Sequence, residues 1–182
     1  MQRTIVTPPA LPPSALAALK QWLGITIAAD DAPLAGLLRA GLDICEGFTG
    51  AVPLETTCEE VLLLSRDWQR LATRPIQAIT AVHGIPATGA RFALPADAYA
   101  LDLDADGGGR VRVTAPGDAT RIAVRFTAGL SAGWDALPEA LRHGVIRLAA
   151  HQHREREGNS ASPVPPAAVA ALWRPWRRMR LA

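Results

Sequence analysis

The sequence predicts an α+β fold in which helices lie towards both ends of the chain and an antiparallel β region is inserted between them. Apolar residues recur at helical spacing before residue 50 and again after Pro138. Between them, at about residues 51–130, short runs rich in Val, Ile and Thr are separated by Gly- and Pro-containing turns. Because helices and strands are segregated along the chain, the pattern favours α+β over a parallel α/β sheet.

The N-terminal segment, residues 1–13, is expected to be an extended arm that lies outside any core. It contains four prolines and no regular apolar pattern, and proline lacks the backbone donor that regular structure uses. A short helix is expected to follow over Ala15–Leu23, with Ser14 as its N-cap and Gly24 at its end.

A second helix is expected from Leu34 to Thr49, capped by Asp30 or Asp31. Its apolar face is formed by Leu34, Leu37, Leu38, Leu42 and Cys45. A free cysteine on such a face is usually a small buried hydrophobe. The other cysteine is Cys58, and the two form neither a disulfide framework nor a C-x-x-C zinc pair.

The β region is expected to contain alternating, β-branched strands joined by glycine and proline turns. The expected strands are Thr56–Leu64, Ile76–Val82, Tyr99–Leu103, Arg110–Thr114 and Arg121–Thr127. The last two are the clearest, because their valines, Ile122 and Phe126 alternate with arginine, alanine and threonine. Turns at Gly107–Gly109 and Pro116–Gly117 separate the strands.

The C-terminal part is predicted to be helix, linker and helix. Pro138 and the apolar spacing after it predict an amphipathic helix to about Glu157. Gly158–Pro166 has linker composition, and a final helix begins near Pro166. The expected organisation is therefore an arm over 1–13, an α+β domain over 14–157, and a linker with a docking segment over 158–182.

Charge is unevenly distributed along the chain. The net charge is +2, but the part from Glu139 onwards has eight arginines against three glutamates, a net charge of +5. This asymmetry indicates that the C-terminal segment meets an acidic partner, either nucleic acid or protein. A short isolated helix is marginal in water, so the Trp- and Arg-rich end must dock, on its own domain or on a partner.

Two short motifs resemble functional sites but lack the residues that would complete them. Asp102–Gly107 matches the start of an EF-hand loop, yet Val113 stands where a bidentate Glu is required, so a solvated hairpin loop is expected. Gly129–Gly133 fits G-x-S-x-G around Ser131, but no strand–helix alternation precedes it, so a turn is expected and a hydrolase is the third-ranked hypothesis.

The cluster His151, His153 and Glu155 also fails to form a metal site. On a helix His151 and Glu155 share a face while His153 points elsewhere, and no further ligand has useful spacing. A polar helix face with ion pairs such as His151–Glu155 is expected. With no phosphate loop, signal peptide or membrane-spanning run, the sequence predicts a soluble, non-enzymatic protein that needs no cofactor and contacts no membrane.

Several short segments occur in one order along nearly the whole chain. They are L-K-Q-W-L-G-I (19–25), Asp30-Asp31, the helix Leu34–Thr49 ending in E-G-F-T-G, R-P-I-Q-A-I-T-A-V (74–82), Y-A-L-D-L-D (99–104), V-R-F-T-A-G (124–129), L-P-E-A-L-R (137–142), the helix through His151, and L-W-R-P-W-R (172–177). In order and spacing they resemble the head–tail adaptor (connector) proteins of long-tailed phages and gene transfer agents. One departure is the pair Trp173 and Trp176, where an aliphatic residue or tyrosine is expected.

The resemblance implies a structural virion protein at the head–tail junction, assembled in the host cytoplasm. It would form a ring, a dodecamer, whose helices surround a channel through which DNA passes without sequence-specific binding. Its partners would be other copies of itself, the portal protein, and a tail-side stopper or head-completion protein that meets the β region. The alternative hypothesis is a nucleic-acid-binding module that uses the basic C-terminus.

The resemblance also assigns a docking site to the C-terminal segment, which would reach into grooves between portal subunits. The expected portal-docking residues are Leu172, Trp173, Arg174, Trp176, Arg177, Arg178, Arg180 and Leu181. The apolar members would be anchors, and the arginines would pair with portal carboxylates.

Overall fold

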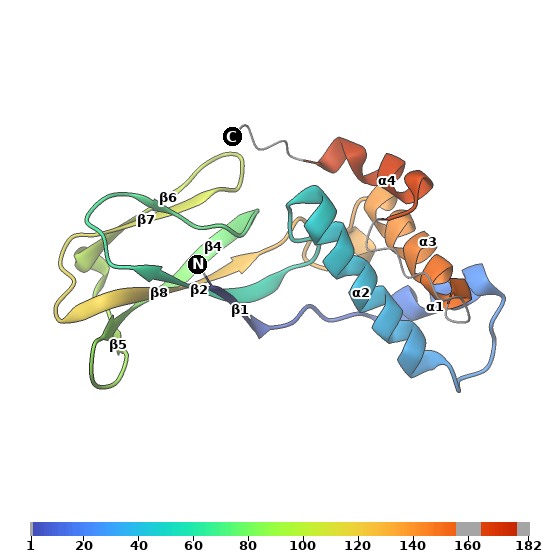
Figure 1. Cartoon of the computed structure of the whole chain (residues 1–182), viewed down its shortest axis with the longest axis horizontal. Coiled ribbons are helices and arrows are strands. Elements are labelled where there is room, and N and C mark those ends of the chain that lie inside the picture. Colours follow the sequence, from blue (N-terminus) through green and yellow to red (C-terminus); the bar gives the residue numbers. More distant parts are fainter. Residues whose placement is uncertain (1, 156–164, 178–182) are drawn as a thin grey trace. The chain divides into compact units, whose positions relative to one another are not determined.

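Apart from a first strand at residues 2–7, helices and strands segregate along the chain as the sequence predicts, which confirms the α+β fold class. The structure is a computed structural model that describes residues 2–155 and 165–177. It divides into two compact units (Figure 1). We call Met1–Pro9 with Glu55–Gly129 the β unit, and Ala10–Leu54 with Leu130–Ala182 the helical unit.

The β unit contains two antiparallel sheets. One has the strand order β1-β2-β8-β4-β5, and the other has the order β3-β7-β6. The strands are β1 (Gln2–Thr7), β2 (Thr56–Leu63), β3 (Gln69–Arg70), β4 (Ile76–Pro86), β5 (Phe92–Ala93), β6 (Tyr99–Leu103), β7 (Gly109–Val113) and β8 (Ala119–Ala128). Each of the five expected strands is present, and β4 is longer than expected.

Strand β8 is the centre of the larger sheet, because it pairs with β2 on one side and β4 on the other. Ile122, Val124 and Phe126 are fully buried, as the alternation predicts. Ala128 continues the same buried face, and Ala123, which was expected on the opposite, outward face, is also fully buried. On that opposite face Arg121 and Arg125 are exposed, as predicted, so Ala123 is the single fully buried exception within the expected strand Arg121–Thr127.

The N-terminal segment differs from the separate arm expected over residues 1–13. Residues 2–7 form β1, an edge strand that pairs antiparallel with β2, from Gln2 opposite Val61 to Thr7 opposite Thr57. The prolines that follow end the strand, and helix α1 begins at Pro13. The segment is therefore extended, but it belongs to a sheet.

A buried carboxylate fixes the loop before β4. Glu60, on β2, is fully buried and accepts hydrogen bonds from the backbone N–H of Ala72 (2.9 Å) and of Thr73 (2.8 Å). The hydroxyl of Thr73 donates to the same carboxylate at 2.6 Å. Such charge-assisted bonds offset the cost of taking a carboxylate out of water. We call Glu60, together with its three hydrogen bonds to Ala72 and Thr73, the polar clamp of the β unit.

The helical unit is built from α1 (Pro13–Leu23), α2 (Asp31–Thr49), α3 (Glu139–Glu155), α4 (Ala167–Trp173) and the 3-10 turns η2 (Trp134–Ala136) and η3 (Arg174–Trp176). α1 and α2 end in left-handed glycines, Gly24 (φ 71°) and Gly50 (φ 73°), a conformation that glycine adopts without strain. Within the described residues no helix is long and apolar enough to cross a bilayer.

The expected N-caps differ from the observed ones. Pro12 precedes α1, and the hydroxyl of Ser14 donates to the carboxylate of Asp135 at 3.0 Å instead of capping the helix. Asp30 precedes α2 without a capping hydrogen bond from its side chain, while Asp31 pairs with Lys20 at 2.6 Å. Ser14 and Asp31 therefore bond to residues that are distant in the sequence instead of capping their helices. Local capping rules do not account for such contacts.

The core of the helical unit confirms the predicted apolar faces. Its fully buried side chains include Leu19 from α1, Leu34 and Cys45 from α2, and Leu141 and Val145 from α3. Burial raises the pKa of the Cys45 thiol to about 12, with a smaller contribution from the neighbouring Glu46 carboxylate. Cys45 is thus a packing residue, as predicted.

Candidate functional site

The C-terminal segment packs on the helical unit through Trp173. This residue is fully buried, and its indole Nε1–H donates to the backbone oxygen of Leu141 at 3.3 Å. Its ring lies 6.0 Å from that of Phe48. The same helix also buries Val169. The sequence left two alternatives for the Trp-rich segment, docking on its own domain or docking on a partner. In the structure, α4 docks on its own unit.

Close approach of α4 to α3 depends on a glycine. A Cβ at Gly144 would overlap the indole of Trp173, so this side chain lies directly over the backbone of α3. Gly41 has a similar role between α2 and α3, since a Cβ there would lie 3.1 Å from Cγ1 of Val145. Gly144 and Gly41 therefore mark places where helices touch, whereas Gly36 and Gly47 in α2 have open space around them.

The predicted docking residues that the structure describes differ in exposure. Trp173 is buried in the core and offers no exposed anchor in this structure. Leu172 and Trp176 are half-buried, while Arg174 and Arg177 are exposed. Arg178, Arg180 and Leu181 lie outside the described residues.

Arg177 has a contact that holds it near the core. Its guanidinium carbon lies 5.4 Å from the centre of the Phe48 ring, a cation–π geometry. Phe48 in turn contacts Trp173. The end of the described chain is thus anchored by aromatic stacking, and the cationic group itself stays at the surface.

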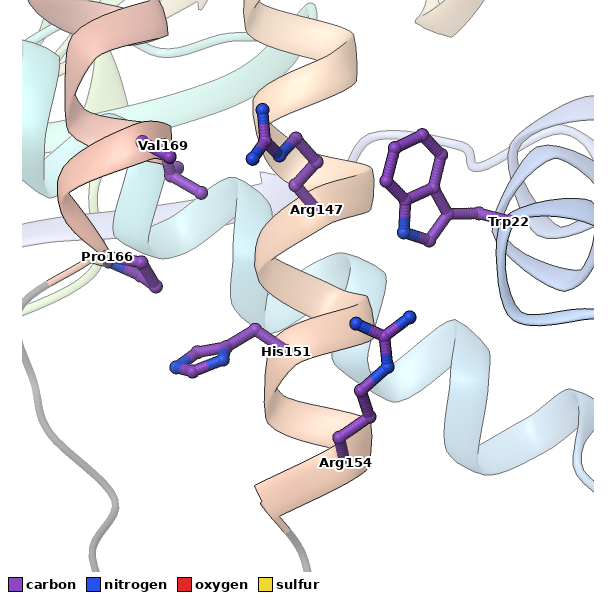
Figure 2. A pocket seen from close by; sticks show the side chains of 7 residues that line it. Trp22, Arg147, His151, Arg154, Pro166 and Val169 are labelled. Carbon is purple, nitrogen blue, oxygen red and sulfur yellow. The ribbon is translucent and has the colours of Figure 1, made fainter.

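A pocket lies on another face of the helical unit, between α1, α3 and the start of α4. It has a volume of about 180 Å³. Figure 2 shows the side chains that line it: Trp22, Arg147, His151, Arg154, Pro166, Ala168 and Val169. The three basic side chains come from successive turns of α3, and α1 and α4 supply the apolar walls. Sequence reasoning missed this pocket, although the spacing of Arg147, His151 and Arg154 was a usable signal.

The pocket is electrostatically positive. His151 Nε2 lies 3.2 Å from the carboxylate of Glu155, which confirms the predicted pair. Within residues 2–155 and 165–177, neither Arg147 nor Arg154 has an ion pair. Trp22 is 45% exposed and meets the ring of His143 edge-on at 5.2 Å. Such a surface suits carboxylate or phosphate groups.

The motifs that resemble functional sites have structural roles. The loop after Asp102 is the β6–β7 hairpin, in which Asp104 accepts a hydrogen bond from the N–H of Gly108 at 2.6 Å. That bond, and then the Arg74 guanidinium, lower the pKa of Asp104. Ser131 donates its hydroxyl to the backbone oxygen of Ala136 at 3.1 Å. No cluster of three or more potential metal ligands occurs in the described part of the chain.

Three solved structures are similar to the chain over its full length. One is the virion of a native gene transfer agent (GTA) particle, at 31% identity and a TM-score of 0.74. Another is the neck of a native GTA particle computed with C12 symmetry, at 30% identity and a TM-score of 0.76. The third is the neck of an empty GTA particle computed with C6 symmetry, at 29% identity and a TM-score of 0.76. Each match covers 100% of this chain and 98% of the other. No protein-family model and no curated protein matches the sequence.

Proposed function

Because this chain belongs to the head–tail adaptor (connector) family of phages and gene transfer agents, we propose that it is a structural neck component of a phage-like particle. It forms a ring between the portal and the next tail-side protein, around the path of the DNA. The observation that carries this proposal is full-length similarity, at about 30% identity, to chains from symmetric GTA necks. The proposed location is the virion, after assembly in the host cytoplasm, and no catalytic step is assigned.

The mechanism proposed for the ring is geometric. Identical copies contact one another head to tail, and the contacts close when the rotation between copies divides a full turn. The C12 and C6 symmetries of the similar necks support a twelvefold ring or a ring with a related symmetry. In this arrangement the DNA passes through the ring without sequence-specific contacts.

We place the portal contact at the end of the helical unit. Arg174 and Arg177 are exposed and available to portal carboxylates, and Trp176 keeps part of its ring at the surface. We include Arg178, Arg180 and Leu181 in this proposed contact on the basis of the sequence alone. Trp173 has a different role, because its indole fixes the helix from which these residues project.

The test is co-sedimentation with the portal ring. Truncation at Gly158 would remove Trp173 and with it part of the core, so a shorter truncation after Arg177 and the double variant Arg174→Ala/Arg177→Ala are preferable. We expect the double variant to weaken binding by about fivefold or more, as loss of two surface ion pairs would. The matched control is Arg39→Ala/Arg66→Ala, which removes two exposed arginines elsewhere.

If the double variant and the truncation both bind as tightly as the intact chain, the portal contact lies elsewhere. If the intact chain neither sediments with the portal nor forms rings, the adaptor proposal itself is wrong.

A second candidate is nucleic-acid binding, and the positive pocket favours it. Arg147, His151 and Arg154 could contact phosphates while Trp22 stacks on a base. Such binding weakens steeply as salt rises. Loss of DNA binding in Arg147→Ala/Arg154→Ala, with a shallower salt dependence, would support this candidate, and absence of DNA binding by the intact chain would remove it.

A further inference from the structure

Strand β1 buries none of its described side chains. Residues 3–7 are all exposed, and Ile5 and Val6 keep 48% and 42% of their surface open to solvent. Within the described residues the strand ends the sheet, so it is paired on one edge, by β2. A β-branched strand whose described side chains are all exposed is a candidate for an interface.

The smaller sheet ends in a second strand of this kind, β6. It pairs with β7 from Tyr99 opposite Val113 to Leu103 opposite Gly109, without a register shift. Leu101 and Leu103 point to one face of the strand and are 40% and 45% exposed. Among the described residues the other edge of β6 has no strand partner.

The remaining sheet edges are protected against pairing. β4 has register shifts at three places, and its partner at the edge, β5, has two residues. β3 also has only two residues. Bulges and short strands are the means by which sheets block edge-to-edge association. β1 has one shift, between Ile5 and Thr7, which leaves Gln2–Ile5 regular.

We propose that β1 of one copy adds to β6 of the next copy, so that an antiparallel or parallel ladder joins the β units of neighbouring subunits. Strand addition satisfies the open backbone groups of both edges and covers Ile5 with Leu101 and Leu103. The two edges belong to different sheets of one unit (Figure 1), so each copy has one donor and one acceptor. A contact of this kind is heterologous, and it closes into a ring when the rotation between copies divides a full turn.

This inference rests on the proposed ring function and specifies how the ring is held together. The strand that pairs with β6 belongs to a second copy, because the chain itself supplies both matching edges. These are the six residues of β1 and the five residues of β6. The cyclic necks to which the chain is similar support the same head-to-tail arrangement.

Cysteine cross-linking tests the contact directly. The full chain is made with Ile5→Cys/Leu101→Cys and with Ile5→Cys/Leu103→Cys, which sample two registers. Cys45 is buried, but Cys58 lies opposite Ile5 in the β1–β2 ladder, so every variant, the control included, also carries Cys58→Ala to prevent an intramolecular disulfide. Under mild oxidation we expect a ladder of covalent oligomers that ends at the ring size and collapses on reduction.

The matched control is Ile5→Cys/Leu63→Cys. Leu63 is 73% exposed but lies on β2, inside the sheet order, so no ladder is expected. In parallel, Ile5→Lys should lower the ring population measured by native mass spectrometry by about tenfold, whereas Leu63→Lys should not.

The outcomes separate the two proposals. Rings by native mass spectrometry, without a ladder in either cysteine pair and without an effect of Ile5→Lys, would overturn the β1–β6 contact and leave the ring function in place. A monomer up to the solubility limit, with no cross-linking, would count against both.

Discussion

The two units of this chain differ in how they bury apolar surface. The helical unit packs large side chains from every helix into one core, including the fully buried Trp134 and Trp173. The β unit has a fully buried carboxylate, Glu60, near its interior and leaves more large apolar side chains exposed. The exposed large apolar side chains of the helical unit are Trp22 and Ile27. Those of the β unit are Ile5, Val6, Leu63, Trp68, Leu101 and Leu103.

This difference indicates a division of roles. A unit with a closed apolar core is stable by itself and can present a rigid surface. A unit with apolar strand edges at its surface gains stability when a neighbour covers them. In the ring that we propose, the helical unit would be the scaffold and the β unit would be the part whose surface assembly completes.

The largest expected effect tests the core of the helical unit. Trp173→Ala removes a buried indole and its bond to Leu141, and should lower the free energy of unfolding by about 3–5 kcal/mol. Urea unfolding followed by far-UV circular dichroism measures it. Trp176→Ala, at a half-buried ring, is the control and should cost about 1 kcal/mol. Equal effects would contradict the assignment of Trp173 to the core.

The next effect tests the polar clamp of the β unit. Glu60→Ala leaves the N–H groups of Ala72 and Thr73 and the Thr73 hydroxyl without their acceptor, and should cost about 3 kcal/mol. Glu55→Ala removes an exposed carboxylate just before β2 and should change stability by less than about 0.5 kcal/mol. If Glu60→Ala is as mild, the clamp does not hold the unit.

The smallest effect at neutral pH concerns Cys45. Because its pKa is raised from 9.0 to about 12 in the fold, the protonated thiol favours the native state. This stabilisation is present below pH 9 and is lost as the pH rises from about 9 towards 12. Native protein at pH 8 should leave both cysteines unmodified by thiol reagents, and unfolded protein should show two reactive thiols per chain. Rapid modification of native Cys45 would contradict its burial.

Much of the fold was predictable because the main elements repeat apolar residues at clear periods. The faces through Leu34 and Leu141, and the strand around Val124, are buried as their spacing predicts. β1 was not predictable because its described side chains, residues 3–7, are all exposed, so no alternation of buried and exposed residues marks it. β3 and β5 have two residues each and are too short for any pattern.

The site was harder to predict than the fold. The sequence identified the Trp- and Arg-rich end but could not separate its buried member, Trp173, from the exposed ones, because that depends on a gap left by Gly144. The pocket needs Trp22 and Pro166 beside the arginines of α3, three segments that only the folded chain brings together. Similarly, nothing local distinguishes Glu60 from its neighbour Glu59.

The path of the chain where it leaves and rejoins the helical unit has an evolutionary consequence. The N–H of Leu130 donates to the oxygen of Val52 at 2.9 Å, and Leu54 bridges to Ser131. Residues 55–129 therefore begin and end at one hydrogen-bonded point, like an inserted module. Such a module can lengthen, shorten or be exchanged during evolution without rearranging the helices. Related chains should accordingly differ most in length between these two points and least in the helices that flank them.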